Sequence, residues 1–521
     1  MKHSIIIRTL SLLLLAGVTT FVSCDKEESD QPLAGKTYTM TVNATKGGNN
    51  VTKALDLDGD NITATWATSE HVYVQKGSTW ATGSLQPQED GTSTTLKGEL
   101  SHIDIEAGNT LTLQFPRSGA RDYSGQVGTL ADIAAKYDYA TASVTIASVT
   151  NGNITTDDVA SFENHQAIVK FTLKDKYKTD AAINATQLVI SDGSNTYTVN
   201  PSSATSEIFV AIPGFSNKTT HLTATVGDVT YIYEKQNVTF DNSQYYEITV
   251  KMTPVYFSVG ASTKVYFAPG NLQATTSDLG ANWTWSFASN QWDHIGKATA
   301  NNKVSGNGKV SENGTVDLFG WVGNTASSSI PAYGIVWTNS YSYYSGTSLK
   351  SDWGVAANAA NNGLGLGGHT DWRTPTNDEW GYLFNTRTNA SQRYGHAIVN
   401  DVRGLIILPD KWILPVGLSF ATGNQSYVTN PANVYTSAEW RKMEKNGAVF
   451  LPAAGRRTGN TVDKVYPDED YPFGYYYSST QYNSQYAYFL SFYTGSLTPQ
   501  RHDQDSRAYG HSVRLVRPVT Y

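Results

Sequence analysis

Cysteine is almost absent from this sequence. Cys24 is the only one among 521 residues, so no disulfide can form within the chain. The ten histidines include no His-x-x-x-His pair, and a single thiol cannot complete a zinc site from sequence neighbours. No Gly-x-Ser-x-Gly nucleophile elbow occurs either. The sequence therefore predicts no metal site, no cofactor and no catalytic residues.

Basic charge and long apolar runs are also scarce. The chain has 38 Lys and Arg against 45 Asp and Glu, a formal net charge of -7, and no basic cluster could neutralise a row of phosphates. Nucleic acid is therefore excluded as a partner. The run Leu10–Val18 has roughly nine apolar residues, whereas a membrane-spanning helix needs about twenty.

The first residues have the pattern of an export signal. Basic residues precede the apolar run, and Phe21-Val22-Ser23-Cys24 follows it as a lipobox-like cleavage site. We expect residues 1–23 to be a lipoprotein signal peptide and Cys24 to carry the lipid, followed by a linker over residues 24–35. Asp25-Lys26-Glu27-Glu28 resembles the acidic tag that sends Bacteroidetes lipoproteins to the cell exterior, although an ordinary solvated linker has the same composition. The expected location is the outer membrane at the cell surface, with the lipid as the only membrane contact.

From about Lys36 to Met252 short runs of alternating apolar and polar residues are separated by Gly, Asn and Asp. This period of two is typical of half-buried strands, and it predicts antiparallel β-sandwiches. The expected strands contain Thr39–Val42, His71–Val74, Leu111–Phe115, Ile168–Leu173, Ile208–Ile212 and Tyr246–Val250.

Scattered motifs in this half are Trp66, His71–Val74, Gln126–Gly128, Tyr137–Tyr139, Phe162–Ala167 and Ile212–Gly214. Together they resemble the fimbrillin family of Bacteroidetes surface proteins (Mfa-like). The resemblance implies a mainly β half made of two successive transthyretin-like β-sandwich subdomains, residues 36–150 and 151–253, with the break near residues 145 to 160. It also implies a stalk or a pilus subunit.

The second half of the sequence is rich in tryptophan, and its loops are rich in Asn, Gly and Ser. Large aromatic side chains bury much area each and can hold together a domain with little regular structure. Thr376 and Glu379 have the spacing of a capping box ahead of an apolar stripe that begins at Trp380, which predicts a helix. A second helix is expected from Ser437 to about Lys445.

A series of motifs covers residues 254–521: Phe267–Gln273, Val316–Trp321, Asp352–Gly354, Trp372–Thr374, Glu379–Trp380, Gly404–Trp412, Gly447–Gly455, Tyr477–Thr480 and Ser512–Arg517. In this order they resemble Bacteroidetes surface domains with a C-type-lectin-like fold (Fibrobacter succinogenes major paralogous domain-like), and the ending resembles variable proteins diversified by retroelements. This closer resemblance implies an α+β ligand-binding domain with a variable region at about 475–513. Tyr477 departs from the pattern, which usually has Trp there.

Side chains suited to contact lie between the framework residues of this ending. Tyr, Asn, Ser and His offer rigid aromatic area and adaptable hydrogen bonding, as in antibody paratopes. We expect these residues to converge on one face that binds a protein or glycan of another cell or a phage. The candidates are Tyr482, Asn483, Tyr486, Tyr488, Tyr493, His502, Asp503, Asp505, Tyr509 and His511.

The remaining residues of this region are expected to form the framework. Tyr475, Tyr476 and Tyr488 fit either the core or its rim. Arg507, Arg514 and Arg517 fit framework salt bridges or solvent exposure, and the alternation in Ser512–Arg517 fits a terminal strand. Burial is expected of Trp372, Trp380, Trp412 and Phe450.

Two other functions remain open. The chain could be a subunit, possibly at the tip, of a pilus in which the fimbrillin-like half exchanges strands with neighbouring pilus subunits. An enzyme of the formylglycine-generating fold is the least favoured alternative, because that chemistry uses cysteine thiols and Cys24 is committed to the lipid. Glu-Pro-Asn and Gln-Pro-Asp do not occur, so calcium-dependent sugar binding has no local support.

Overall fold

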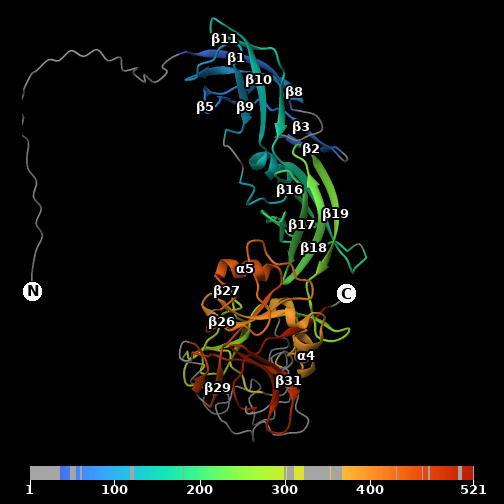
Figure 1. Cartoon of the computed structure of the whole chain (residues 1–521), viewed down its shortest axis with the longest axis vertical. Coiled ribbons are helices and arrows are strands. Elements are labelled where there is room, and N and C mark those ends of the chain that lie inside the picture. Colours follow the sequence, from blue (N-terminus) through green and yellow to red (C-terminus); the bar gives the residue numbers. More distant parts are fainter. Residues whose placement is uncertain are drawn as a thin grey trace, which may run out of the picture.

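Strands dominate the computed structural model of the chain, and three parts follow one another along its long axis (Figure 1). No helix in the described part of the chain is long and apolar enough to cross a membrane. The predicted signal peptide, Cys24 and the linker lie outside the described residues. The structure describes residues 36–46, 54–58, 61–117, 122–179, 181–298, 301, 310–321, 353, 366–429, 431–459, 461–466, 470–502 and 507–519.

The first part is a β-sandwich whose strands have the expected alternation. In β1 the side chains of Tyr38, Met40, Val42 and Ala44 enter the core, and the residues between them are partly or fully exposed. β1 is antiparallel to β8 and parallel to β11 and β12. The strands are β1 Tyr38–Lys46, β2 Ala54–Asp58, β3 Asn61–Thr65, β4 Tyr73–Lys76, β5 Thr79–Trp80, β6 Thr82–Gly83, β7 Gln86–Pro87, β8 Ser93–Ser101, β9 Thr110–Phe115, β10 Ala140–Thr150, β11 Asn153–Thr156 and β12 Ala160–Asn164.

The second part is a seven-stranded sheet in the order β15-β14-β17-β18-β19-β13-β16. A short helix that the sequence did not predict, α1 Leu130–Asp132 continued by the π-helix η1 Ile133–Tyr137, packs Ile133 and Tyr137 into its core. The strands are β13 Ala167–Asp175, β14 Gln187–Ser191, β15 Thr196–Val199, β16 Glu207–Ile212, β17 Phe215–Val226, β18 Val229–Phe240 and β19 Tyr245–Pro254.

The division between these parts differs from the expected break near residues 145 to 160. Asn151 and Gly152 form a two-residue hairpin turn with φ of 51° and 77° that joins β10 to β11, as Asn-Gly pairs commonly do. β11 and β12 then pair with β1, so the first core extends to Phe162. The second sheet begins at Ala167.

The third part consists of small sheets of two to four strands around several aromatic cores. Its beginning and its end lie in one sheet, since β21 pairs with both β20 and β34. The elements are β20 Phe257–Ser258, β21 Lys264–Phe267, β22 Leu272–Thr276, β23 Thr284–Phe287, β24 Gly314–Val316, η4 Leu366–Gly368, α4 Asn377–Gly381, η5 Tyr382–Thr386, η6 Ala390–Gln392, β25 Tyr394–Val399, β26 Val402–Ile407, β27 Val434–Tyr435, α5 Ser437–Lys445, β28 Val449–Pro452, β29 Arg456–Thr458, β30 Thr461–Asp463, β31 Gly474–Gln481, β32 Ala487–Tyr493, β33 Ser496–Arg501 and β34 Val516–Pro518.

Both predicted helices of this part are present with complete capping boxes. Thr376 and Glu379 begin α4, and Thr436 and Glu439 begin α5, so each helix start satisfies backbone donors that would otherwise lack acceptors. Among the expected framework aromatics, Trp372, Trp380 and Phe450 are buried. Trp412 is only partly buried against the core beneath α5.

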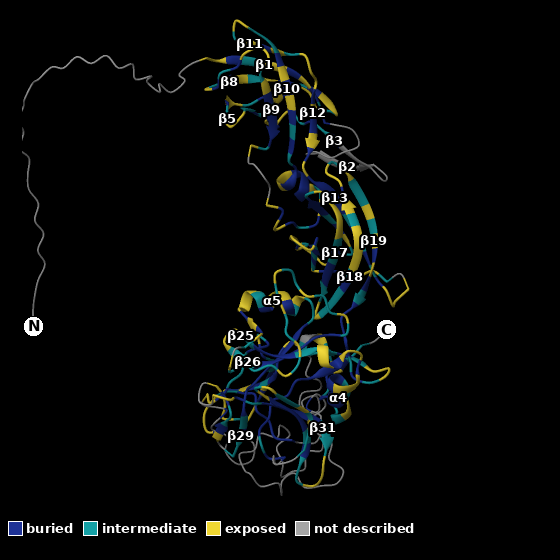
Figure 2. Cartoon of the chain, viewed as in Figure 1, coloured by how far each residue is buried: buried dark blue, intermediate teal, exposed yellow. Residues whose placement is uncertain are grey.

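The second and third parts share a polar contact at the turn between β17 and β18. Asp228 in this turn accepts from Arg517 Nη2 at 2.8 Å and lies 3.3 Å from His369 Nε2. Arg517 is largely buried, and its guanidinium also lies over the ring of Tyr266 at 4.7 Å. In Figure 2 buried residues, drawn dark blue, fill the interior of the third part next to the ends of β17 and β18.

Candidate functional site

The predicted contact residues that the structure describes lie on or beside a three-stranded antiparallel sheet, β31-β32-β33, at the end of the molecule that lies farthest from the first sandwich (Figure 1). Both faces of this sheet are packed. Tyr476 and Leu490 belong to one core, whereas Tyr475 and Phe489 belong to another that contains Trp321. Tyr475 and Tyr476 are therefore core residues, which resolves the alternative that the sequence left open.

The loop between β31 and β32 is internally hydrogen-bonded. The backbone amides of Tyr482 and Asn483 both donate to the carbonyl of Tyr486, at 3.0 and 3.1 Å. Asn483 Oδ1 accepts from the amides of Gln485 and Tyr486, at 2.8 and 2.9 Å, an Asx turn. The Asn483 side-chain oxygen is thus used within the loop.

Arg507 holds this loop from beneath. It is fully buried, its Nε donates to the carbonyl of Tyr486 at 3.2 Å, and its Nη2 donates to Gln481 Oε1 and to the carbonyl of Asn483. The guanidinium also lies 4.5 Å from the ring centre of Trp321. Burial lowers the pKa of Arg507 to about 10, so the cation keeps its charge at neutral pH. A buried charge therefore fixes the conformation of an exposed loop.

Three of the predicted side chains meet above this loop, and we call them the aromatic cluster: Tyr482, Tyr488 and His502. The rings of Tyr482 and His502 stack with centres 4.1 Å apart and planes 19° apart. Tyr488 meets both edge-on, at 5.3 and 5.4 Å, a geometry that favours aromatic contact. Tyr482 is 45% exposed. The residue after β31, the start of β32 and the residue after β33 thus meet in one aromatic cluster, in which Tyr482 is exposed and Tyr488 and His502 are half-buried.

Tyr493 and Tyr509 lie apart from this cluster, which contradicts the expectation of one face. Tyr488 and Tyr493 are five positions apart on β32, so the pleat sends them to opposite faces of the sheet. Tyr493 stacks on Phe473 at 4.5 Å. Tyr509 lies against the guanidinium of Arg456 at 5.4 Å. Each of these two tyrosines therefore packs on residues outside the aromatic cluster.

The prediction that His511 is a contact residue was wrong. It is fully buried, and its ring stacks on Tyr477 at 4.3 Å and packs against Phe489 at 4.9 Å. The expected terminal strand is also shorter than the pattern implied, since only Val516–Pro518 is a strand and all of residues 510–517 are buried. Asp503 and Asp505 lie outside the described residues.

The framework arginines partly follow expectation. Arg517 pairs with Asp228 as a framework salt bridge. Arg514, in contrast, is buried and donates to neutral oxygens: Asn271 Oδ1 and the carbonyls of Ala268 and Phe450, at 2.7 to 3.0 Å. Sequence reasoning assigned Arg507 no part in the site, because no local pattern indicates that its guanidinium reaches back to a loop more than twenty residues earlier.

No protein-family model and no curated protein matches the chain. Solved structures do resemble it. A Bacteroides uniformis protein with a proposed role in cell adhesion aligns with 15% identity over 42% of this chain and 97% of its own, at a TM-score of 0.25. A fimbrial assembly protein from Parabacteroides distasonis aligns with 9% identity over 44% and 94%, at 0.23. A fimbrial protein from Bacteroides ovatus aligns with 11% identity over 93% and 99%, also at 0.23. At these TM-scores the likenesses carry no conclusion about function.

The chemistry of the aromatic cluster suits binding. Within the part of the chain that the structure describes, no group of three His, Cys, Asp or Glu side chains could hold a metal ion. The cluster instead combines stacked aromatic rings with a loop whose backbone is fixed by Asn483 and Arg507. Such a surface loses little conformational entropy when it meets a partner.

Proposed function

We propose that the chain is a lipid-anchored cell-surface protein that binds a protein or glycan of another cell or a phage through the aromatic cluster. The C-type-lectin-like part would present a retroelement-diversified surface, and the fimbrillin-like sandwiches would form the stalk beneath it. The observation that carries the proposal is the packing of the exposed ring of Tyr482 on the half-buried rings of Tyr488 and His502, beside a loop held by Arg507. Binding needs neither cofactor nor turnover.

The position of the cluster supports this assignment. It lies at the end of the molecule opposite the first sandwich, whose β1 is the first described strand after the predicted lipid attachment at Cys24 (Figure 1). A protein anchored at that end would hold the cluster away from the membrane. Rigid tyrosines of this kind are frequent hot spots, each worth about 2 kcal/mol or more when truncated.

The decisive experiment compares two tyrosine variants on a display strain. Tyr482→Ser with Tyr488→Ser removes two members of the cluster, and Tyr471→Ser is the matched control because Tyr471 is 53% exposed and outside the cluster. Binding of labelled cells, phages, and arrayed glycans and proteins is then measured. We expect the double variant to lose at least about 30-fold in affinity for whichever partner binds, and the control to keep it. Equal binding by both variants would refute the assignment.

The anchor has its own test. Cys24→Ser should release the protein from the membrane fraction, and alanines at Lys26, Glu27 and Glu28 should keep the lipid while reducing protease accessibility on intact cells. A Cys24→Ser variant that stays membrane-bound and accessible would contradict the lipid assignment.

A pilus subunit is the second candidate, and the position of β1 favours it. This strand lies inside its sheet with neighbours on both sides, β8 on one and β11 and β12 on the other, yet it is the first described strand of the chain. A strand from a neighbouring subunit could replace it with the same alternation of core residues. Cleavage after Lys46 in isolated protein should then yield ladders of oligomers, and monomers alone would argue against polymerisation.

A further inference from the structure

A cavity separate from the aromatic cluster lies between the second and third parts of the molecule. Its volume is about 270 Å³, slightly below the roughly 300–1,000 Å³ of typical small-molecule sites. It is bounded on one side by the second sheet and on the other by the end of α5 and residues 413–416. A ligand of this size would touch both parts at once.

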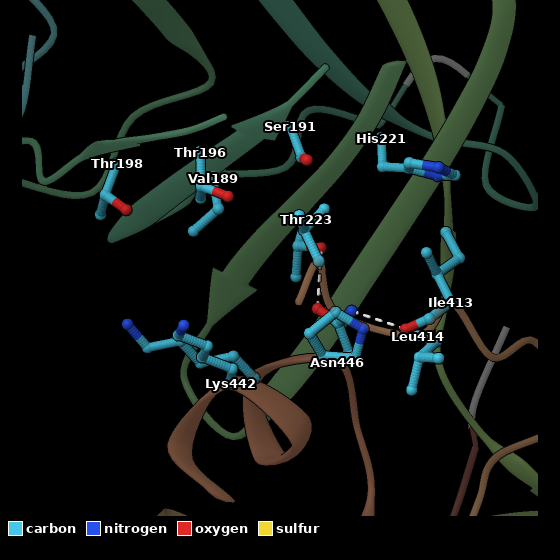
Figure 3. A pocket seen from close by; sticks show the side chains of 13 residues that line it. Val189, Ser191, Thr196, Thr198, His221, Thr223, Ile413, Leu414, Lys442 and Asn446 are labelled. Carbon is cyan, nitrogen blue, oxygen red and sulfur yellow. Dashed lines mark hydrogen bonds between the residues drawn. The ribbon is translucent and has the colours of Figure 1, made fainter. Parts of the chain in front are cut away.

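One wall of the cavity is the outer face of β15, β14 and β17. Ser191 pairs with Thr196 on one side and with His221 on the other, so their side chains leave the same face of the sheet. Thr198 and Thr223 extend this row by one pleat. The alternate residues point into the core of the sandwich. Figure 3 shows the hydroxyl groups of this wall above the end of the helix. Hydroxyls both donate and accept hydrogen bonds.

The opposite wall is held in place by Asn446. Thr223 Oγ1 donates to Asn446 Oδ1 at 3.2 Å, and Asn446 Nδ2 donates to the carbonyl of Ile413 at 2.7 Å (Figure 3). Leu414 follows and is 41% exposed, although it is a large apolar residue beside the cavity. The geometry therefore joins a polar wall to an apolar one.

The charge of the cavity is positive although the chain is acidic overall, with a net charge of -7. Lys442 and Lys445 line it from the last turn of α5, and none of the lining residues is Asp or Glu. Glu439, three residues before Lys442 on α5, is a carboxylate whose pKa is lowered by hydrogen bonds from Thr436 and by the charge of Lys442, but it does not line the cavity. Two ammonium groups beside a row of hydroxyls fit an anion that also carries hydroxyl groups.

We infer that this cavity binds a small anionic sugar, a monosaccharide with a carboxylate or sulfate group. The ammonium groups of Lys442 and Lys445 meet the anion, and the hydroxyls of Ser191, Thr196 and Thr198 hydrogen-bond the sugar hydroxyls. Leu414 covers an apolar C–H face of the ring. Because the sugar contacts both walls, its binding also ties the second sheet to the third part.

The mature chain is titrated by calorimetry with glucuronic acid, N-acetylglucosamine 6-sulfate and uncharged glucose. Either anionic sugar should bind at least 10-fold more tightly than glucose, and raised salt should weaken that binding because charge screening reduces the ionic contribution. Lys442→Glu with Lys445→Glu should lower the affinity at least 10-fold. Thr198→Val keeps the shape of the side chain, removes one hydroxyl and should lower the affinity by a smaller factor.

A matched control and a folding check keep the test sharp. Lys97→Glu with Lys251→Glu makes the same charge change at exposed sites away from the cavity and should leave binding unchanged. Thermal unfolding of each variant reports whether it folds, and a loss of affinity in Thr198→Val alone would support the site if the lysine pair failed to fold. Equal affinity for glucose, no binding of either anionic sugar, or an equal loss in the control pair would overturn the inference. Tyr482→Ser with Tyr488→Ser should not change this binding. The proposal about the cavity and the proposal about the aromatic cluster can therefore be refuted independently.

Discussion

The sandwiches and the third part satisfy their buried backbone in different ways. In the second sheet β17 and β18 have twelve residues each and pair along most of their length. The third part has strands of two to eight residues, and buried arginines donate to its carbonyl groups: Arg457 to Gly459 and Leu318, and Arg514 to Ala268 and Phe450. Where ladders are short, guanidinium groups supply the missing donors, since buried carbonyls need partners.

Buried cations are held in two ways in this chain. In the first sandwich Lys46 is buried with Glu70 at 3.0 Å and lies 4.3 Å from the ring centre of Trp66. In the third part Arg387 pairs with Asp410 at 3.3 Å, whereas Arg514 donates only to neutral oxygens. Arg514 therefore spreads its charge over several dipoles and ties irregular segments of the third part to one another.

The largest expected effect tests whether the cores are independent. Trp66 packs on Phe115 and Phe162 in the first core, and Trp380 lies buried beside Leu383 and Phe384 in the third part. Each change to Ala should cost about 3–5 kcal/mol in its own region, because a buried aromatic leaves a cavity. Differential scanning calorimetry of Trp66→Ala and Trp380→Ala should show two different transitions shifting. A single transition that moves equally in both would show that the parts unfold as one unit.

The next effect tests the role of guanidinium groups. Arg514→Lys replaces the planar guanidinium by a single amino group, which cannot reach all three acceptors. At least one buried acceptor loses its donor, at about 1–3 kcal/mol, and the transition of the third part should fall accordingly in urea denaturation. Burial lowers the pKa of Arg514 to about 10, so the native guanidinium is charged at neutral pH. Arg441→Lys at an exposed pair is the control and should change stability by under about 1 kcal/mol.

The stability of each region at alkaline pH can be tested through one of its buried tyrosines. Burial raises the pKa of Tyr231 in β18 and of Tyr435 in β27 to about 12. An unfolded tyrosine ionises near pH 10, so between pH 10 and 12 the unfolded chain loses protons that the folded chain keeps. Stability therefore falls as pH rises through this window.

Replacing each tyrosine by phenylalanine tests which region causes the fall in stability with rising pH. Tyr231→Phe should reduce the alkaline loss for the second sheet. Tyr435→Phe should remove only part of the loss for the third part, because burial also raises the pKa of Tyr427 and Tyr476 there. At neutral pH Tyr435→Phe should also cost about 1 kcal/mol, because the carbonyl of Ser419 loses its donor. Calorimetric scans from pH 8 to 11 would check both. A slope unchanged in each variant would show that other groups cause the loss.

The sequence predicted where the strands lie better than it predicted which strands belong to the first part and which to the second. Alternation located β1, β9, β13, β16 and β19 because each has one buried face. The hairpin at Asn151 and Gly152 has the same composition as a linker, so the domain break was placed too early. The helix at Leu130–Tyr137 was missed because eight residues give too short a periodic pattern.

The candidate site was partly accessible from sequence. The period of two in β32 already separates Tyr488 from Tyr493, had it been applied to the contact residues as well as to the core. The burial of His511 had no local signal. Its segment is fixed by bridges to Phe319 and, through its neighbours, to Arg457 and Tyr476, and long-range pairings of this kind do not appear in a local pattern.

The smallest expected effect separates contact residues from framework within the third part. Tyr482 is exposed, and its ring rests on His502 and Tyr488, whereas the loop beneath it is held by Asn483 and Arg507. Tyr482→Ser should therefore change the free energy of unfolding by less than about 0.5 kcal/mol, measured by urea denaturation. A drop as large as that of Tyr435→Phe would show that the ring itself holds the loop. The aromatic cluster would then be part of the framework, and its exposure would no longer indicate a binding surface.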